Sequence, residues 1–313
     1  MTLESQQTIK YLPADNYISF LRRADDGKNG ITHLAKVVWD DGVERDSWVK
    51  IYPNGKEKSI INELVSFLIG SSIGLPMPQR AGLLMLETKV LNDDLVDQLS
   101  QVDRYRGYTY AWVSQDLCGK NPRLELVNNP KNQNIIYQYL VKDLEDWEYL
   151  PTMIAFDDLI LNTDRNMGNF IQLPNKEFFL IDHGEALGGQ WNEEVFLNHD
   201  CDHEGKLDMI FYNCIYRKNK NYGLFQFENT LKSLEVAKKE HKSAFNRISN
   251  ELRTNLIDML GEESVKPVIK GLTPQPIYET IFSFLEKRAH SSKGFSERCN
   301  NIFAYHSIPV PLS

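Results

Sequence analysis

The segment "LILNTDRNMGNFIQLPNKEFFLIDHG" (Leu159–Gly184) contains two apolar runs that each lead to a carboxylate. Asp164 follows the first run, Asp182 follows the second, and Asn169 lies between them. Pro174-Asn175-Lys176 separates two short apolar stretches and indicates a hairpin turn. Because a short hairpin brings its ends together, we expect the side chains of the two aspartates and Asn169 to face one point.

Two carboxylates and an amide are the hard oxygen ligands that Mg²⁺ prefers in proteins. This ion keeps several of its waters and takes one or two carboxylates together with phosphate oxygens. The remaining carboxylate would be free to accept a proton. The simpler alternative is an Asx-rich turn that ends a helix at Asp164–Asn169 and a strand-end turn at Asp182.

The first half of the chain is predicted to be rich in strands. "HLAKVVWDDGVERDSWVKIY" (33–52) consists of two β-rich runs around Asp41-Gly42, a dipeptide typical of tight hairpin turns. On the second strand, Lys50 shares a face with Trp48 and Tyr52, so we expect it to be partly enclosed. The alternative is that Lys50 lies on a solvated face.

A helix is predicted after this hairpin. Apolar residues recur at helical spacing from Ile60 to Leu68, and Gly74 followed by Pro76 ends the pattern. Glu63 lies at the edge of the apolar stripe, a position that a surface residue usually occupies. A strand lysine and a glutamate on the next helix can nevertheless meet, and such a contact would form an ion pair between Lys50 and Glu63.

The remaining elements complete a fold of the α+β class. "GLLMLETKVL" (82–91) and "YTYAWVS" (108–114) indicate two more strands, and "QDLCGKNP" then breaks the pattern near Asp116. Helical periodicity follows in "NIIYQYLVKDLEDWEYL" (134–150), in "PTMIAFDDLILN" (151–162) and over much of 205–288. We therefore expect two lobes, one β-rich with a single helix and one mostly helical.

The lobes are assigned by residue range. The sequence predicts an N-terminal extension (1–17), an N-lobe (18–116), a helical C-lobe (117–300) and a surface tail (301–313). A length of 313 residues suits two packed lobes.

Composition excludes several classes of protein. The net charge of −8 gives no support to nucleic-acid binding. No apolar run approaches the ~20 residues of a membrane span, and the N-terminus lacks the pattern of a secretory signal. The four cysteines have no paired spacing and indicate free thiols in a reducing compartment, which predicts a cytoplasmic protein.

"HDCDH" (His199–His203) suggests zinc, but no second ligand pair follows, and a polar loop is the better interpretation.

The motifs resemble those of protein-kinase-like enzymes. "NTDRNMGNF" followed by "LIDHG" resembles their Asp-x-x-x-x-Asn catalytic loop and Asp-x-Gly metal loop, with HipA-like bacterial kinases as the best match and phosphatidylinositol kinases next. "WVKIYPNG" and "NELVSFLIGSSIGLPMP" resemble the HipA-like lysine strand and glutamate helix. The resemblance covers residues 18–190 and implies a two-lobed kinase fold.

The resemblance also implies roles for individual residues. Asp164 matches the catalytic aspartate, Lys50 the lysine that binds ATP phosphates, and Glu63 its partner. Asn169 and Asp182 match the Mg²⁺ ligands.

Other parts of the site follow from the same motifs. Arg165 and Asn166 belong to the catalytic loop and are candidate catalytic residues. The segment 27–32, with Gly27, Gly30 and Thr32, matches the phosphate-covering loop. The segment 112–117, with Gln115 and Leu117, matches the hinge that holds adenine through backbone hydrogen bonds.

The sequence departs from the family pattern in three ways. Asn166 replaces a histidine, although an amide still forms hydrogen bonds. His183 replaces the phenylalanine of the usual Asp-Phe-Gly, so packing at the metal loop is expected to differ. The chain begins almost at the kinase lobe, and we expect it to lack the extra N-terminal module of longer HipA toxins and part of their antitoxin contact surface.

The function implied by the resemblance is a kinase of the HipA-like, toxin-antitoxin type. It would transfer the γ-phosphate of ATP, with Mg²⁺, to a hydroxyl, most readily Ser or Thr of a protein substrate, and an antitoxin or other regulatory protein would be a partner. Two alternatives stay open: a kinase for small molecules or lipid headgroups, and a pseudokinase that acts as a binding module.

Overall fold

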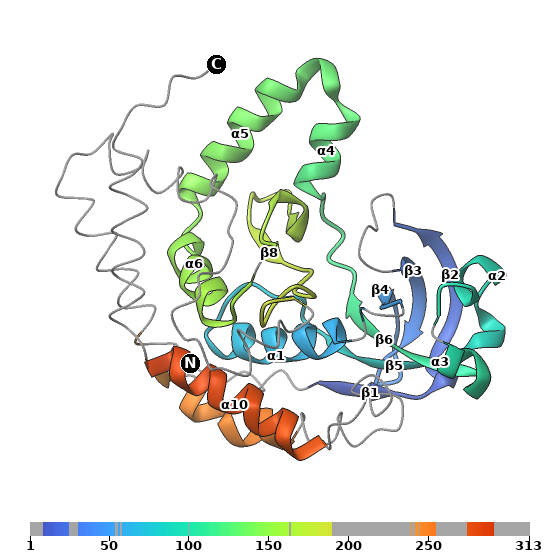
Figure 1. The fold of residues 1–313 in the computed structure, drawn as a ribbon. Coiled ribbons are helices and arrows are strands. Elements are labelled where there is room, and N and C mark those ends of the chain that lie inside the picture. The colour runs from blue at the N-terminus through green and yellow to red at the C-terminus, as the bar shows by residue number, and fades with distance from the viewer. Residues whose placement is uncertain are drawn as a thin grey trace.

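The computed structural model describes residues 9–24, 31–53, 56, 58–99, 101–162, 164–189, 239, 242–243, 245–254 and 274–290. These residues form an α+β structure in which a β-sheet is built from the first part of the chain and helices dominate the rest (Figure 1). No helix among them is long and apolar enough to cross a membrane.

The main sheet has six strands in the order β1-β5-β6-β4-β3-β2. All neighbours are antiparallel except β1 and β5, which run parallel. The strands are β1 (Lys10–Leu12), β2 (Tyr17–Arg23), β3 (Ile31–Val38), β4 (Glu44–Ile51), β5 (Ala81–Glu87) and β6 (Tyr108–Gln115).

The β3–β4 hairpin forms where Asp41-Gly42 predicts it. The amide of Gly42 donates to the carbonyl of Trp39 at 2.9 Å, and the amide of Trp39 donates to the carbonyl of Val43 at 3.1 Å. Gly42 has a φ of +75°, a conformation that residues with a Cβ rarely adopt. The turn sets the register in which Thr32 is paired with Lys50.

The two faces of β4 differ as the alternating pattern predicts. Val49 and Ile51 belong to an apolar cluster that also contains Leu91, Leu95 and Leu99, so one face of the sheet is covered by the segment after β5. Tyr52, at the end of β4, belongs instead to the larger cluster around helix α1 (Ser59–Ser72). Lys50 therefore extends toward α1.

Helix α1 is buried on all sides from Ser59 to Gly70. It lies between the sheet and the helical part of the chain (Figure 1). The helix ends where Gly74 predicts: the amide of Leu75 donates to the carbonyl of Gly70 at 3.0 Å, and Gly74 has a φ of +76°. Because the apolar surface surrounds the helix, Glu63 is enclosed and only 2% exposed, and its interpretation as a surface residue is wrong.

The helical part begins after β6, and its first elements bring the chain to the segment that contains Asp164, Asn169 and Asp182. They are α4 (Pro122–Asn128), the 3₁₀ turn η3 (Pro130–Asn132), α5 (Gln133–Asp146), α6 (Leu150–Leu159), the 3₁₀ turn η4 (Met167–Asn169), and the strands β7 (Phe170–Gln172) and β8 (Phe178–Leu180). The predicted hairpin is confirmed: β7 and β8 pair antiparallel, with Phe170 opposite Leu180. Its turn is closed by the amide of Leu173 donating to the carbonyl of Glu177 at 2.9 Å.

The long helix α10 (Pro274–His290) contains the predicted helical stretch 277–289 and packs against α6. Residues 245–254 are also helical, and Phe245, Ile248 and Leu252 join the core around α1 and α6. The "HDCDH" segment lies outside the described residues, as does the rest of the predicted helical stretch 205–273 apart from 239 and 242–243.

Three local expectations differ from the structure. Lys10–Leu12, placed in an N-terminal extension, is the edge strand β1 of the sheet. The strand expected over 82–91 ends at Glu87 and continues as the 3₁₀ turn η2 (Thr88–Val90). Four elements between β1 and β6 were not predicted: the 3₁₀ turn η1 (Ala14–Asn16), the strand β2, and the helices α2 (Asp93–Val96) and α3 (Gln101–Arg106).

The helix expected over 134–150 ends early, at Asp146. Trp147 has extended backbone angles (φ −69°, ψ 119°), and Pro151 stands in the first turn of α6. Proline is favoured in the first turn of a helix because its missing amide costs no hydrogen bond there. The buried Trp147 ring contacts Phe170 and Phe178, which explains why the chain turns at this point.

Candidate active site

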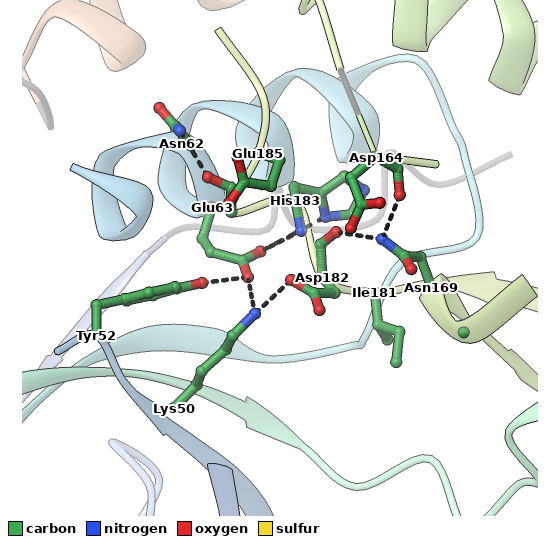
Figure 2. Close-up of polar contacts among 12 residues, drawn as sticks. Lys50, Tyr52, Asn62, Glu63, Asp164, Asn169, Ile181, Asp182, His183 and Glu185 are labelled. Atoms are coloured by element: carbon green, nitrogen blue, oxygen red, sulfur yellow. Dashed lines mark hydrogen bonds and ion pairs between the residues drawn. The ribbon is translucent and has the colours of Figure 1, made fainter. Parts of the chain in front are cut away.

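Lys50 joins the sheet, helix α1 and the segment after β8. Its Nζ lies 3.5 Å from Oε1 of Glu63 and also pairs with Oδ1 of Asp182 (Figure 2). The lysine side chain is only 12% exposed, so its placement on a solvated face is wrong and the predicted contact with Glu63 is confirmed. Burial opposes the charge, but Asp182 and Glu63 outweigh it and raise the pKa of Lys50.

Both carboxylate oxygens of Glu63 have partners. Oε1 accepts from Lys50 and from the hydroxyl of Tyr52 at 2.7 Å, and Oε2 accepts from the backbone amide of His183 at 2.9 Å. Burial alone would raise the pKa of Glu63, but Lys50 and the hydrogen bonds from His183 lower it to about 2. Glu63 is therefore an anion at neutral pH.

His183 is buried at the position where the related motif has phenylalanine. Its ring packs edge-on against Phe156, with ring centres 5.8 Å apart, and its Nδ1 lies 3.6 Å from Glu63. Burial and the nearby Arg165 lower the pKa of His183 in spite of the glutamate. The imidazole is consequently neutral at pH 7, and Lys50 balances the charge of Glu63.

Asp164 is exposed and is held by the turn around it. Its amide donates to Oδ1 of Asn162 at 3.1 Å, and its carboxylate accepts from Nδ2 of Asn166 at 3.2 Å. Asn166 therefore contacts the aspartate from the position at which the motif that it resembles has histidine. Partial burial and the charge of Asp182 raise the pKa of Asp164, which brings this carboxylate closer to what a proton acceptor needs.

Asn169 bridges the two aspartate segments. Its Nδ2 donates to the backbone carbonyls of Asp164 and Asp182, at 3.0 and 3.1 Å. Because the amide nitrogen makes both bonds, the amide oxygen is the atom that remains for a cation. The structure thus brings Asp164, Asn169 and Asp182 together as the hairpin predicts (Figure 2).

Asp182 has an unusual backbone. Its φ of +56° lies in the left-handed region, which costs a residue with a Cβ about 1–2 kcal/mol. The side chain is 43% exposed, in contrast to the enclosed Glu63. The conformation turns the chain sharply into residues 182–189, here called the Asp182 loop.

These residues fit Mg²⁺. One exposed carboxylate and one amide oxygen match an ion that takes few protein ligands and keeps its waters. Groups of three or more His, Cys, Asp or Glu that would enclose a metal are absent from the described part of the chain. The described residues therefore contain no site in which such side chains alone would surround a metal ion.

Arg165, predicted as a catalytic residue, lies inside the protein. Its Nε and Nη2 each bind a carboxylate oxygen of Asp157 at 2.9 Å, and the side chains of both residues are 0% exposed. Its Nη1 donates to the carbonyls of Asn169 and Ile181, both at 3.2 Å. The guanidinium of Arg165 is therefore enclosed by protein groups and connects Asp157 to the segments on both sides of the hairpin.

The predicted nucleotide-binding segments are only partly described. Gly27 and Gly30 lie outside the described residues, whereas Thr32 is in β3, opposite Lys50. In the predicted hinge, the amide of Gln115 already donates to the carbonyl of Arg80 at 3.0 Å, so this N–H is not available to adenine. Leu117 follows in the linker to α4, half-buried.

The predicted hinge segment is held by Asp116, whose contacts the sequence did not predict. The carboxylate of Asp116 accepts from the indole nitrogen of Trp48 at 2.9 Å and from the amide of Cys118 at 3.3 Å.

The sequence also did not identify Asn62 and Asp157 as residues that hold the site together. Both are polar residues inside apolar helices, and this is the signal that marks them.

No protein-family model matches the sequence, and no protein of curated function matches it. Among solved structures, the chain is similar to a Helicobacter pylori proinflammatory kinase, CtkA, with 14% sequence identity, a TM-score of 0.45, and coverage of 96% of this chain and 100% of that chain. This TM-score is too low to establish a common fold.

Proposed function

We propose that the protein is an ATP- and Mg²⁺-dependent kinase with a two-lobed, protein-kinase-like fold. The observation that carries the proposal is the chain of contacts from Lys50 to Glu63 and to Asp182, with Asn169 joining Asp182 to Asp164. A charged lysine, a cation-binding pair and a carboxylate with a raised pKa are the parts that phosphoryl transfer needs.

Each residue has a role in this proposal. Lys50 binds the phosphates of the nucleotide, and Glu63 holds the lysine in place. Asp164 orients the acceptor hydroxyl and accepts its proton, while Asn166 fixes the rotation of the Asp164 carboxylate. Mg²⁺, held by the Asn169 oxygen and the Asp182 carboxylate, would neutralise charge on the phosphates.

The finer proposal is that the acceptor is Ser or Thr of a protein. The exposure of Asp164 supports it, because a hydroxyl on a large molecule can reach an exposed carboxylate. Membership of the HipA-like group, and with it an antitoxin partner and a cytoplasmic location, is part of the proposal and rests on sequence features alone.

The proposal is tested by following ATP turnover in the presence of Mg²⁺. The Asp164→Asn variant should keep its fold and its nucleotide affinity but transfer phosphate about 10²- to 10⁴-fold more slowly, because it cannot accept the proton. Asp97→Asn is the matched control, since the Asp97 side chain is 81% exposed. Equal turnover by wild type and Asp164→Asn would remove Asp164 from the chemistry.

Two further arms separate the alternatives. Incubation of the protein with Mg-ATP and cell lysate proteins, or with a set of soluble alcohols and lipid headgroups, shows which acceptor gains the mass of a phosphate. Nucleotide binding with no turnover under any of these conditions would identify a pseudokinase.

A further inference from the structure

Two consecutive residues of α1 bind the Asp182 loop. Glu63 accepts from the amide of His183 at 2.9 Å, and Nδ2 of Asn62 donates to the carbonyls of Gly184 and Gly189, at 2.7 and 2.9 Å. Asn62 is 0% exposed, so these bonds do not compete with water. Both ends of the loop are therefore attached to the helix that carries Glu63.

Tyr52, which follows β4, binds the same helix from the side of the sheet. Its hydroxyl donates to Glu63 at 2.7 Å, and Nζ of Lys50 lies 5.0 Å from the centre of its ring. A Cβ at Gly184 would lie 2.9 Å from the Tyr52 oxygen and 3.3 Å from the Cβ of Ser59. The loop backbone thus packs directly against Tyr52 and α1, and a residue with a Cβ at this position would have to displace the Tyr52 side chain.

The opposite side of the loop is bound as well. The amide of Leu187 donates to the carbonyl of Ile160 at 2.7 Å, and the amide of Gly188 donates to the carbonyl of Leu161 at 3.1 Å. Through these bonds the end of α6 holds the second half of the loop. The loop is therefore enclosed between α1 and α6.

We propose that Tyr52 and Asn62 are positioning residues that hold α1 and the Asp182 loop as one preassembled unit. Glu63 then stays on Lys50, and Asp182 stays next to them, whether or not nucleotide is bound. The consequence for nucleotide binding rests on the proposed kinase function, whereas the assembly itself does not.

The hydrogen bonds make disengagement of α1 unfavourable. If the helix moved away, Glu63 would leave the Tyr52 hydroxyl, the His183 amide and Lys50 without their shared acceptor. Each lost hydrogen bond to a charged group disfavours the open arrangement about tenfold or more. A swung-out helix is consequently a rare state of this protein.

Hydrogen exchange tests the assembly without any ligand. In the full-length protein, amide exchange is measured by mass spectrometry on peptides that cover 181–189, for wild type, Asn62→Ala and Tyr52→Phe. Both variants should speed exchange there by about tenfold, because each removes bonds that hold the loop or Glu63. Tyr105→Phe and Asn134→Ala are matched controls, since both residues are exposed, and should exchange as wild type does.

Nucleotide affinity is measured on the same proteins by calorimetry with Mg-ADP. Tyr52→Phe should raise the Kd for Mg-ADP, because Glu63 and its partner Lys50 are then held less firmly. The same variant should change KM more than kcat. Tyr52→Phe loses a single hydroxyl, so it decides the question if Asn62→Ala fails to fold. If Tyr52→Phe exchanges its amides in 181–189 at the wild-type rate and binds Mg-ADP with the wild-type Kd, the proposal of a preassembled unit is wrong. Faster exchange together with no Mg-ADP binding by wild type would instead retain the unit and overturn the kinase proposal.

Discussion

Arg165 and Asp157 form a buried ion pair in which two parallel N–H···O bonds of 2.9 Å join the guanidinium to the carboxylate. The remaining nitrogen of Arg165 donates to the carbonyls of Asn169 and Ile181. Asp157 also accepts from the side chain of Asn162 at 2.8 Å. The pair therefore connects the end of α6 to both arms of the hairpin that carries the candidate site.

Replacing Arg165 by methionine should destabilise the protein strongly. The change leaves Asp157 buried without its partner, and losses of this kind cost about 3–5 kcal/mol in the free energy of unfolding. Urea denaturation of wild type and Arg165→Met measures the difference. Arg45→Met is the control, because Arg45 also forms two N–H···O bonds to one carboxylate, from Nη1 and Nη2 to Asp41 at 2.8 and 2.7 Å, but at the surface, where a loss of less than about 1 kcal/mol is expected. Equal losses at the two sites would contradict a special role for the buried pair.

Lys50 and Glu63 should act as a coupled pair. Lys50→Met and Glu63→Ala each remove the same contact, so the double variant should lose less nucleotide affinity than the two single losses combined. A coupling of about 0.5–3 kcal/mol is expected for residues in contact. Calorimetry with Mg-ADP on wild type, both single variants and the double variant gives this value. Additive losses would mean that the 3.5 Å contact does not contribute to nucleotide affinity.

Removing the carboxylate of Asp182 should abolish the effect of Mg²⁺ on nucleotide binding. A methyl group cannot bind the ion, and Asn169 offers only one neutral oxygen. Nucleotide affinity is measured with and without Mg²⁺ for wild type and Asp182→Ala. Asp94→Ala, at a carboxylate that is 81% exposed, should retain the full enhancement. Enhancement that survives in Asp182→Ala would place the metal elsewhere.

The buried His33 should make stability fall in mildly acidic solution. Burial, with a smaller contribution from Arg23, lowers the pKa of His33 to about 4, and its side chain contacts Tyr17 and Phe20 without exposure to solvent. Between about pH 6.5 and 4 the unfolded chain binds a proton that the folded chain does not. The contribution of His33 to the free energy of unfolding is therefore fully present above about pH 6.5. It is lost as the pH falls from about 6.5 to about 4, by up to about 3 kcal/mol.

Chemical denaturation at several pH values measures this effect of His33. In His33→Phe the contribution disappears, so the difference in unfolding free energy between wild type and variant should change across that interval. A constant difference over the interval would show that His33 does not titrate as its burial requires.

Local sequence predicted the parts of the fold that depend on short-range chemistry. Asp41-Gly42 specifies a turn almost alone, because one position needs a positive φ. The short hairpin after Asn169 places Asp182 near Asp164 by chain geometry. The meeting of Lys50 and Glu63 also followed from the order of a strand and the next helix.

The features that sequence did not reveal depend on packing between distant segments. Arg165 was predicted as a catalytic residue from its place in the motif alone, whereas its partner Asp157 lies inside α6 and was not identified. The three-residue strand β1 is too short for periodicity to detect, and its parallel pairing with β5 arises only in the folded sheet.

Arg288 links the order of synthesis to the completion of the site. From the buried face of α10, its Nε donates to the carbonyls of Asp158 and Leu159, at 2.8 and 3.2 Å. These carbonyls stand at the end of α6, immediately before the loop that carries Asp164. They gain the guanidinium as a donor only after residue 288 has left the ribosome. A nascent chain that already contains Lys50, Asp164 and Asp182 therefore still lacks the support at the base of this loop. Synthesis that stops before α10 should yield a chain whose whole proposed set of reacting residues is present but not held in place.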